Sequence, residues 1–339
     1  MTLEQLRDKV MEWDQTLEFT DSKAIADSTA KYATVLAQLD YNAEREWNKY
    51  LPTQHPEYTS NYMERLAAWI GNVPNEVEQK LLLEYALFIS FFSHSDFTAL
   101  YQTAIHRVVM PWMAEQIQAR LGSSCDAGQR LSDSILYEIN HHTWFCPVTD
   151  SMDINEFYKI NCLSGIEHHP QFATLQEFGH QEKICRYMQE NSLTRIVLLE
   201  DFVGTGIKSI KPAQWAVENL SVPILFIPLI CCPLGLSALR QIRGLTVRPV
   251  VELQNRDLLG DGRKGDMSWP IATDMEAFAR TISATCGWDG SEIFGVANTG
   301  CSIILFSNTP ANTLSFVHKK SQSTSIWHPL FPRVSRGLK

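Results

Sequence analysis

Several patterns that mark common kinds of site or membrane segment are missing from this 339-residue sequence. Its eight cysteines include no pair with C-x-x-C spacing, so a structural zinc site is not expected. No G-x-S-x-G turn is present, which argues against a serine hydrolase of the α/β type. The apolar stretch 222–236 contains three prolines and is too short to cross a bilayer. It is expected to be a buried strand with turns at its ends.

Positive charge is also scarce. The chain has 29 Lys and Arg residues against 38 Asp and Glu residues, a net charge of −9, which argues against a broad nucleic-acid-binding surface. A basic cluster near the carboxyl end is predicted to be a solvated tail, with an acidic partner or RNA as the alternative; it contains Lys319, Lys320, Arg333, Arg336 and Lys339. The first residues do not resemble a signal peptide, so a cytoplasmic location without a membrane partner is expected.

The segment 195–209 carries the clearest functional pattern. Ile196–Leu199 form an apolar run typical of a buried strand, and Glu200 and Asp201 stand at its end. A Gly-Thr-Gly loop at 204–206 then leads into a predicted helix. Ligands of open α/β sheets bind outside the carboxyl ends of strands, where a glycine-rich loop can direct N–H groups at a phosphate. Because two carboxylates there can accept hydrogen bonds from sugar hydroxyls, or hold Mg²⁺, the pattern predicts a site for a phosphorylated sugar.

This arrangement resembles the 5-phosphoribosyl-1-pyrophosphate (PRPP) motif of type I phosphoribosyltransferases, in which two acidic residues and a Thr-Gly loop follow a hydrophobic strand. The resemblance implies that Glu200 and Asp201 are the catalytic pair and contact the ribose hydroxyls. It also implies a phosphate-binding segment made of Val203, Gly204, Thr205, Gly206, Ile207, Lys208 and Ser209. The implied cofactor is Mg²⁺, bound through the ligand and with no direct ligand from the protein.

The variant Asp-Phe-Val-Gly-Thr-Gly at 201–206 resembles more particularly a phosphoribosyltransferase-like family of bacterial conflict and antiphage defence loci, some of them retron-associated. Asn308–Leu314 and Trp327–Arg333 resemble the carboxyl-terminal signature of that family, so the resemblance covers residues 140 to 335. The sequence departs from the family pattern at Ile207 and Lys208, where a polar pair such as Asn-Gln is expected. Lys208 could still add a charge-assisted contact to a phosphate.

Two other interpretations of the same segment remain open. A short apolar strand ending in Glu-Asp also resembles the Mg²⁺-binding Walker B strand of ATPases, but that site needs a G-x-x-x-x-G-K-[ST] loop, which is missing. The nearest candidate, residues 260–266, lacks the spacing and is predicted to be a polar surface turn. A site that has lost its ligand is the other alternative. The two carboxylates together with the Thr-Gly loop favour the phosphosugar site over both.

The rest of the chain predicts two domains. Residues 1–140 are expected to form a helical amino-terminal domain, with an apolar stripe from Val77 to Phe92 at helical spacing and a second long helix, kinked near Pro111, at 96–121. Residues 141–339 are expected to form a type I phosphoribosyltransferase-like α/β domain. Its strands are predicted at 144–149, 196–199, 224–230, 246–251 and 302–306. Because helices separate most of these strands, a mainly parallel sheet is expected.

For function, the resemblance implies a cytoplasmic effector of a bacterial antiphage defence system, toxic when a partner releases it. It would bind PRPP or a ribonucleotide and act at the anomeric carbon of a 5-phosphoribosyl group, as a glycosyltransferase or a related nucleotide N-glycosidase. The implied partner is a protein or ribonucleoprotein of the same locus. A non-enzymatic sensor of PRPP or nucleotides, or a scaffold that regulates a partner, remains the alternative. No motif indicates the base or the acceptor.

Overall fold

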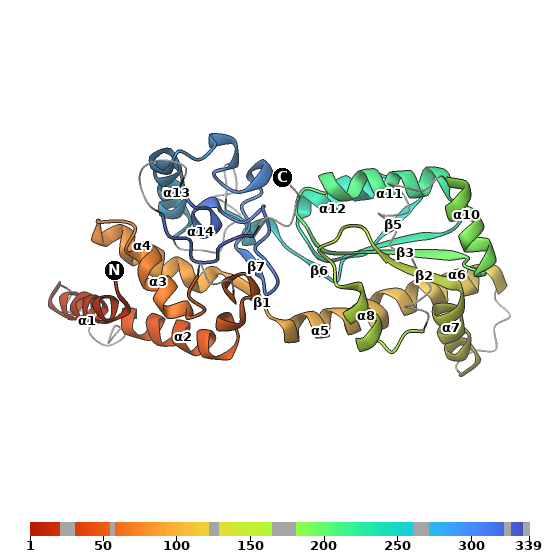
Figure 1. Ribbon diagram of the computed structural model, residues 1–339, viewed down its shortest axis with the longest axis horizontal. Helices are drawn as coiled ribbons and strands as arrows, with labels where there is room; N and C mark the ends of the chain where they lie inside the picture. Colours follow the sequence, from red (N-terminus) through yellow and green to blue (C-terminus); the bar gives the residue numbers. More distant parts are fainter. Residues whose placement is uncertain are drawn as a thin grey trace. The chain divides into compact units, whose positions relative to one another are not determined.

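The computed structural model describes residues 1–20, 31–54, 58–121, 129–164, 181–259, 271–321 and 327–334. The chain divides into two compact units, shown in Figure 1. Unit 1 combines Met1–His94 with Asn255–Lys339, and unit 2 is Ser95–Gln254. The expected boundary at residue 140 divides the chain at a different place. The reason is that the helices directly after residue 95 pack on the sheet of unit 2, whereas the carboxyl-terminal segment completes the fold of unit 1.

Unit 2 is built on a parallel sheet. Its strands are β2 (Thr143–Pro147), β3 (Arg195–Val203), β4 (Ile224–Cys231), β5 (Leu245–Val247) and β6 (Val251–Glu252). The strand order is β2-β3-β4-β5, β6 also pairs with β4, and every pair is parallel. The mixed α/β fold class with a mainly parallel sheet, predicted from the sequence, is confirmed.

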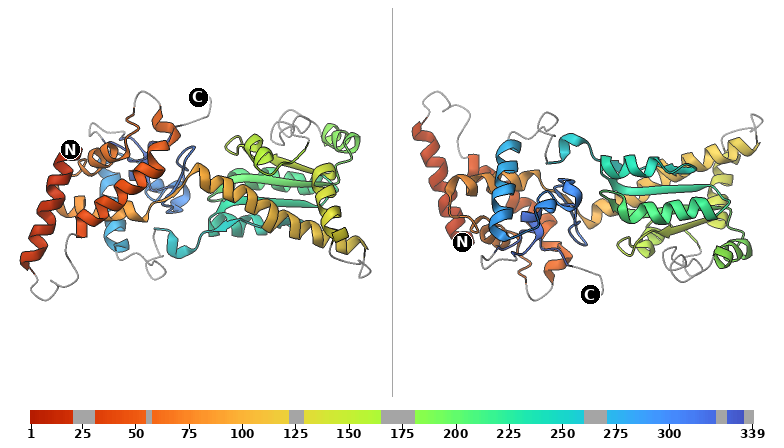
Figure 2. Two further views of the ribbon diagram at one scale, coloured as in Figure 1. Left: turned by 90° about the horizontal axis from the view of Figure 1, so that it is seen from below. Right: turned by 90° about the horizontal axis from the view of Figure 1, so that it is seen from above.

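Helices cover both faces of this sheet, as Figures 1 and 2 show. Those of unit 2 are α5 (His94–Thr103), the π-helical segment η4 (Ala104–Val109), α6 (Met110–Leu121), α7 (Gln129–His142), α8 (Ile154–Ile160), α10 (Gln181–Glu190), α11 (Ile207–Asn219) and α12 (Pro233–Arg240). Because consecutive strands are neighbours and crossovers are right-handed, α10, α11 and α12 lie on one face. The other face carries α5, α6 and α8, with Tyr101 and Phe157 packed edge to face.

Proline explains two departures from the predicted elements of unit 2. The strand predicted at 246–251 is divided into β5 and β6, because Pro249 between them has no N–H to donate to β4. The long helix predicted at 96–121 is present, but its irregular part is the π-helical segment η4, which ends at Val109, two residues before Pro111. A proline removes one i→i−4 hydrogen bond, and the altered spacing of η4 lies in the turn where that bond is lost.

Unit 1 is helical, with one two-stranded parallel sheet of β1 and β7. Its elements are α1 (Leu3–Thr20), α2 (Lys31–Arg45), η1 (Trp47–Lys49), η2 (Leu51–Gln54), α3 (Tyr62–Ile70), α4 (Glu76–Tyr85), η3 (Ala86–Phe88), β1 (Ser90–Phe92), η7 (Asn255–Asp257), α13 (Ala272–Cys286), η8 (Gly290–Glu292), η9 (Val296–Asn298), β7 (Ile303–Leu305) and α14 (Ser315–His318). The apolar stripe predicted at 77–92 is wrong in part, because α4 ends at Tyr85 and Val77 is exposed. Asn75 caps the start of α4, because its side chain accepts a hydrogen bond from Val77 N.

Both parts of the carboxyl-terminal motif belong to unit 1 and bond to each other. The Asn308 side chain bonds both the N–H and the carbonyl of Val334, and Arg333 Nε donates to Thr309 O at 3.0 Å. Tyr50 OH donates to Pro332 O at 2.8 Å, and its ring lies edge to face with Phe331. These contacts tie the carboxyl-terminal motif to the first ninety residues of the chain. Among the described residues, no helix has the length and apolar character that a membrane span requires.

Candidate functional site

Strand β3 carries both predicted catalytic carboxylates. It continues beyond the predicted run Ile196–Leu199 as far as Val203, so Glu200 and Asp201 lie inside the strand and not after its last residue. Both side chains are buried, with 4% of Glu200 and 7% of Asp201 exposed. Two adjacent buried carboxylates repel each other unless protons or hydrogen-bond donors compensate them. The donors that compensate this pair therefore identify the rest of the site.

Two hydroxyl residues that follow the neighbouring strand β2 supply these donors. Thr149 donates to Glu200 twice, from its hydroxyl to Oε1 at 2.7 Å and from its backbone N–H to Oε2 at 3.1 Å. The Ser151 hydroxyl lies 2.8 Å from Asp201 Oδ1 and 3.3 Å from Glu200 Oε1. The two hydroxyl oxygens are themselves 2.8 Å apart. Phe202 N also donates to Asp201 Oδ1 at 2.7 Å. The four side chains form one hydrogen-bonded cluster.

The electrostatics of the pair are asymmetric. Burial, followed by the negative charge of Asp201, raises the pKa of Glu200 from 4.5 to about 8, although the hydrogen bonds from Thr149 and Ser151 act in the opposite direction. Glu200 therefore holds a proton more tightly than an exposed glutamate does. Tyr101 on α5 lies near Asp201: burial raises the pKa of Tyr101, and the charges of Glu156, Asp153 and Asp201 add to this effect. The site is acidic and holds its negative charge away from water.

A first prediction follows from the raised pKa. The folded chain keeps the Glu200 proton up to about pH 8, whereas the unfolded chain loses it near pH 4.5, so the folded state loses stability as pH rises through this interval. Glu200→Gln removes this titration. We expect it to stabilise the protein at pH 8 by on the order of 2 kcal/mol, or about 5 °C in melting temperature, and to have little effect near pH 5. Thermal unfolding across this range measures the difference; an equal effect at both ends would contradict the prediction.

The predicted phosphate-binding segment follows β3 directly and enters α11. Gly206 has a left-handed backbone (φ +80°) and precedes the first residue of α11. Its carbonyl accepts hydrogen bonds from Ser209 N at 2.9 Å and Ile210 N at 2.8 Å. Among the described residues, the N–H groups of Gly206 and Lys208 donate to no acceptor. A loop that ends at a helix amino terminus and leaves N–H groups available is suited to an anion.

The segment's side chains differ in exposure. Val203, Gly204, Gly206 and Ser209 are buried, Thr205 is partly exposed, and Ile207 and Lys208 point outward. The Thr205 hydroxyl accepts a hydrogen bond from Ile207 N at 3.4 Å. Ile207, at the position where the sequence resemblance leads us to expect a polar residue, is 65% exposed at the very start of α11. The segment's buried side is thus glycine backbone, and its exposed side carries one apolar and one cationic side chain.

The start of α12 supports the loop from behind. Gly235 N donates to Gly204 O at 3.0 Å, and Cys232 N donates to Val203 O at 2.8 Å. A Cβ at Gly235 would lie only 2.7 Å from both Gly204 O and the Val203 side chain, so only glycine allows this approach. The loop is therefore held between the end of β3 and α12.

Thr149 and Ser151 are the parts of this site that the sequence reasoning missed. The sequence predicts a strand at 144–149 and indicates no role for the residues that follow it. The available signal is positional: β2 and β3 are parallel with Pro147 opposite Leu199, so the residues after Pro147 emerge beside Glu200. Hydroxyl residues that directly follow one parallel strand therefore lie at the same edge of the sheet as an acidic motif at the end of the neighbouring strand.

The described residues contain no group of three or more His, Cys, Asp or Glu side chains that could hold a metal ion. Glu200 and Asp201 are only two, and hydroxyl groups of the chain already occupy oxygens of both. This donor set does not make a complete Mg²⁺ site, which needs six oxygens. It fits an ion whose remaining ligands come from a bound phosphate or from water. The turn at 260–266, including Arg263 and Lys264, lies outside the described residues.

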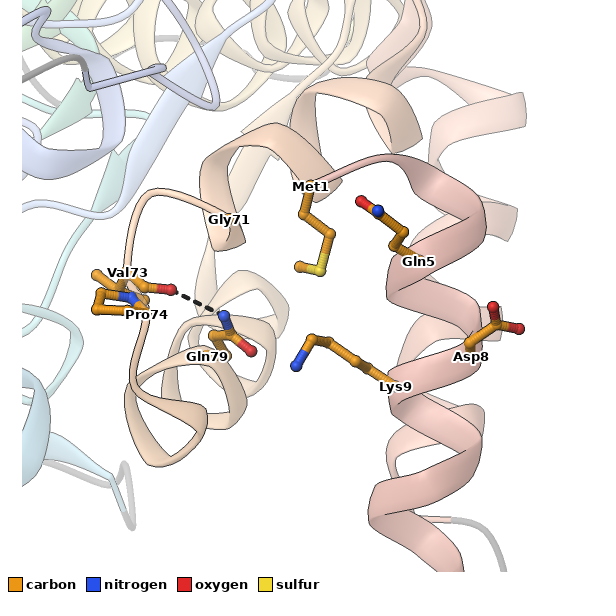
Figure 3. A pocket seen from close by; sticks show the side chains of 8 residues that line it. All are labelled: Met1, Gln5, Asp8, Lys9, Gly71, Val73, Pro74 and Gln79. Atoms are coloured by element: carbon orange, nitrogen blue, oxygen red, sulfur yellow. Dashed lines mark hydrogen bonds between the residues drawn. The ribbon is translucent and has the colours of Figure 1, made fainter.

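A separate pocket of about 420 Å³ lies within unit 1 and contains none of the predicted site residues. It opens between the start of α1 and the α3–α4 connection, where Figure 3 shows Lys9 opposite Gln79. Gln79 Nε2 donates to Val73 O at 2.8 Å, while its buried Oε1 has no hydrogen-bond partner. The described lining includes the titratable side chains Asp8 and Lys9 but no hydroxyl, thiol or imidazole group.

The comparisons with known proteins give one match. The protein-family model PRTase-CE, a phosphoribosyltransferase-like family, matches residues 66–333. This region is more than half of the chain; it includes all of unit 2 and both parts of the carboxyl-terminal motif. No curated protein and no solved structure matches the chain.

Proposed function

The chain belongs to the PRTase-CE family, and from this premise we propose that residues 200–209 bind the 5-phosphoribosyl group of PRPP or of a ribonucleotide. The observation that carries the proposal is the pairing of two buried carboxylates with a glycine loop at the amino end of a helix, on one edge of a parallel sheet. The carboxylates suit the ribose hydroxyls as hydrogen-bond acceptors. The loop suits the 5-phosphate as a set of backbone donors.

The proposed reaction takes place at the anomeric carbon. The bond from this carbon to pyrophosphate or to a base breaks, the electron pair leaves with that group, and an acceptor or water forms the new bond. Positive charge develops on the ribose ring, and the negative charge of the buried acidic pair stabilises it. Mg²⁺ held by the ligand would neutralise charge on a departing pyrophosphate. The loop and Lys208 fix the opposite end of the sugar.

We further propose the biological setting that the sequence motifs suggest: an effector of a bacterial antiphage defence system, held inactive by a partner from the same locus and acting on nucleotide or PRPP pools when released. The motif Asp-Phe-Val-Gly-Thr-Gly at 201–206 and the block at 308–314 support this setting. The alternative is a sensor that uses the same site to bind PRPP or a nucleotide without turning it over.

Binding and product analysis test the molecular part of this proposal. We expect calorimetry of the full chain with Mg²⁺ to detect PRPP or a ribonucleoside 5′-phosphate, and the matching compound without its phosphate to bind at least about tenfold more weakly. Incubation followed by analysis for free base, pyrophosphate or ribose 5-phosphate separates enzyme from sensor. If neither PRPP nor any ribonucleotide binds, the proposed site is wrong.

Expression in bacteria tests the biological part. Wild-type chain with its genomic neighbours is expected to protect cells against phage, and the chain alone is expected to slow growth and change nucleotide pools. Asp201→Asn is expected to remove both effects. If growth, pools and phage resistance never respond to Asp201, a housekeeping role becomes the better interpretation.

A further inference from the structure

The pocket in unit 1 contains a buried hydrogen-bond acceptor that no described group of the protein uses. Gln79 on α4 is 5% exposed, and its Nε2 donates to Val73 O at 2.8 Å. Its Oε1 is buried and accepts no hydrogen bond from a described residue. Figure 3 shows this oxygen directed toward the Lys9 side of the pocket. A buried oxygen without a donor costs stability, so it marks a place that a donor from outside the chain can fill.

A cation lies across the pocket from this acceptor. Lys9 extends from α1 toward Gln79, as Figure 3 shows, whereas Asp8 extends away from Gln79. On α4, Glu76 pairs with Lys80 at 2.6 Å, and Lys9 forms no ion pair with a described residue. The pocket therefore presents an ammonium group that is available to an anion.

The walls between these two groups are apolar. Val73 and Pro74 line the pocket on the side of the α3–α4 connection, and the Met1 side chain lines it on the side of α1. The connection is fixed, because the Asn72 side chain exchanges two hydrogen bonds with the backbone of His328, both at 2.9 Å. A flat ring fits between a thioether and a proline, since sulfur makes favourable contacts with aromatic rings.

We propose that this pocket is a second ligand site, for a nucleoside 5′-monophosphate whose base carries an amino group, as AMP does. The amino group donates to Gln79 Oε1, the base packs between Met1 and Pro74, and the phosphate accepts from Lys9. Because Oε1 is buried, the unbranched side chains of Met1 and Lys9 move to admit the amino group. The volume of about 420 Å³ lies within the range of small-molecule sites.

This pocket is separate from the site proposed at residues 200–209. It belongs to unit 1, and its α1 side lies outside residues 66–333, which the family model matches. Gln79 and Lys9 recognise a base and a phosphate, and neither contact involves the ribose-binding carboxylates. The inference therefore does not rest on the proposed function.

Calorimetry of the full chain carrying Asp201→Asn measures this pocket, because that substitution is expected to disable the site at 200–209. We expect AMP to bind with a dissociation constant below about 1 mM. Purine riboside 5′-monophosphate lacks only the amino group, and adenosine lacks only the phosphate. Each should bind at least about tenfold more weakly than AMP. Equal binding of AMP and either analogue overturns the inference, as does a failure of AMP to bind.

Lys9→Gln in the same background tests the phosphate contact. It should weaken AMP by about tenfold and leave adenosine unchanged, since the phosphate contact alone is lost. The matched control is Arg7→Gln, which removes an exposed positive charge from the same helix outside the pocket lining. This control should change neither affinity. Equal AMP affinity of the two variants overturns the inference.

Gln79→Met tests the amino contact. It should remove the preference for AMP over purine riboside 5′-monophosphate, because the acceptor is gone while the unbranched shape is kept. A preference that survives in the folded variant contradicts the assignment of Oε1. Gln79→Met also loses the hydrogen bond to Val73 O, so its melting temperature is measured first. If it does not fold, Lys9→Gln decides, because Lys9 is partly exposed and that variant keeps this bond.

Hydrogen exchange locates the ligand. In the chain carrying Asp201→Asn, AMP is expected to protect backbone amides at 1–9 and 71–79, and none at 195–209. Protection confined to 195–209 refutes the pocket as a nucleotide site. Protection at 1–9 and 71–79, in a protein whose wild-type residues 200–209 respond to neither PRPP nor ribose 5-phosphate, leaves the pocket standing and refutes the proposed function. The reverse pattern refutes the pocket alone.

Discussion

Replacing Asp201 by asparagine is expected to lower the affinity for a 5-phosphorylated riboside by about 100-fold or more, and to abolish activity. A hydrogen bond to a charged acceptor contributes about 1.5–3 kcal/mol, and the uncharged amide also loses the negative charge that faces the sugar ring. The folded state should hardly suffer. Asparagine can still accept from Ser151 and Phe202, and the like charge beside Glu200 is removed. Calorimetry and thermal unfolding of the same sample measure both effects.

The matched control is Asp133→Asn, the same change on an exposed position of α7, and it should alter neither affinity nor stability. The prediction for Asp201→Asn would be contradicted if this variant kept its affinity for the riboside but melted many degrees below the wild-type chain. That outcome would make Asp201 a structural residue and would remove it from the proposed site.

The sequence predicted the sheet of unit 2 well because its signals there are local. The run Ile224–Ile230 is apolar throughout, as a strand covered on both faces must be, and it forms most of β4. The helix predicted after the Gly-Thr-Gly loop is α11, which begins at Ile207 directly after Gly206. The fold class followed from this alternation of elements.

The division into units could not be predicted, because it depends on pairings between distant segments. Ser90 on β1 pairs with Ile303 on β7, and Tyr50 bonds with Thr309 and Pro332. No local pattern shows that a helical start and a carboxyl-terminal block will share one core. The stripe at 77–92 failed for a related reason: its last residues extend as β1, where a partner strand from far along the chain takes over their backbone groups.

The site was predicted as far as one continuous motif reaches. Glu200, Asp201 and the loop at 204–206 stand next to one another in sequence, so their proximity in the structure follows from the chain itself. Thr149 and Ser151 reach the carboxylates through the register of β2 against β3, about fifty residues away. Strand order and register are long-range properties, and a single sequence does not reveal them. The roles assigned to all of these residues stay predictions until a ligand is measured.

Gly206→Val should remove the binding of 5-phosphorylated ribosides, by about 100-fold or more, while unphosphorylated ribosides change little. A valine at φ +80° strains the backbone at the first turn of α11 and adds branched bulk where an anion must approach the N–H groups. The strain itself is expected to reduce stability by about 1–3 kcal/mol. Calorimetry with ribose 5-phosphate and with ribose separates the loss of the phosphate contact from a general loss of the site.

Gly244→Val provides the control for backbone strain. Gly244 also has a positive φ, +91°, and directly precedes β5, so it lies at the opposite, amino-terminal edge of the same parallel sheet. Its valine variant should lose a similar amount of stability and keep its affinity for ribose 5-phosphate. Equal losses for ribose and ribose 5-phosphate in Gly206→Val, or an equal loss of binding in Gly244→Val, would mean that the loop is not a phosphate site. Loss confined to Gly206 and to the phosphorylated ligand assigns the 5-phosphate to the start of α11.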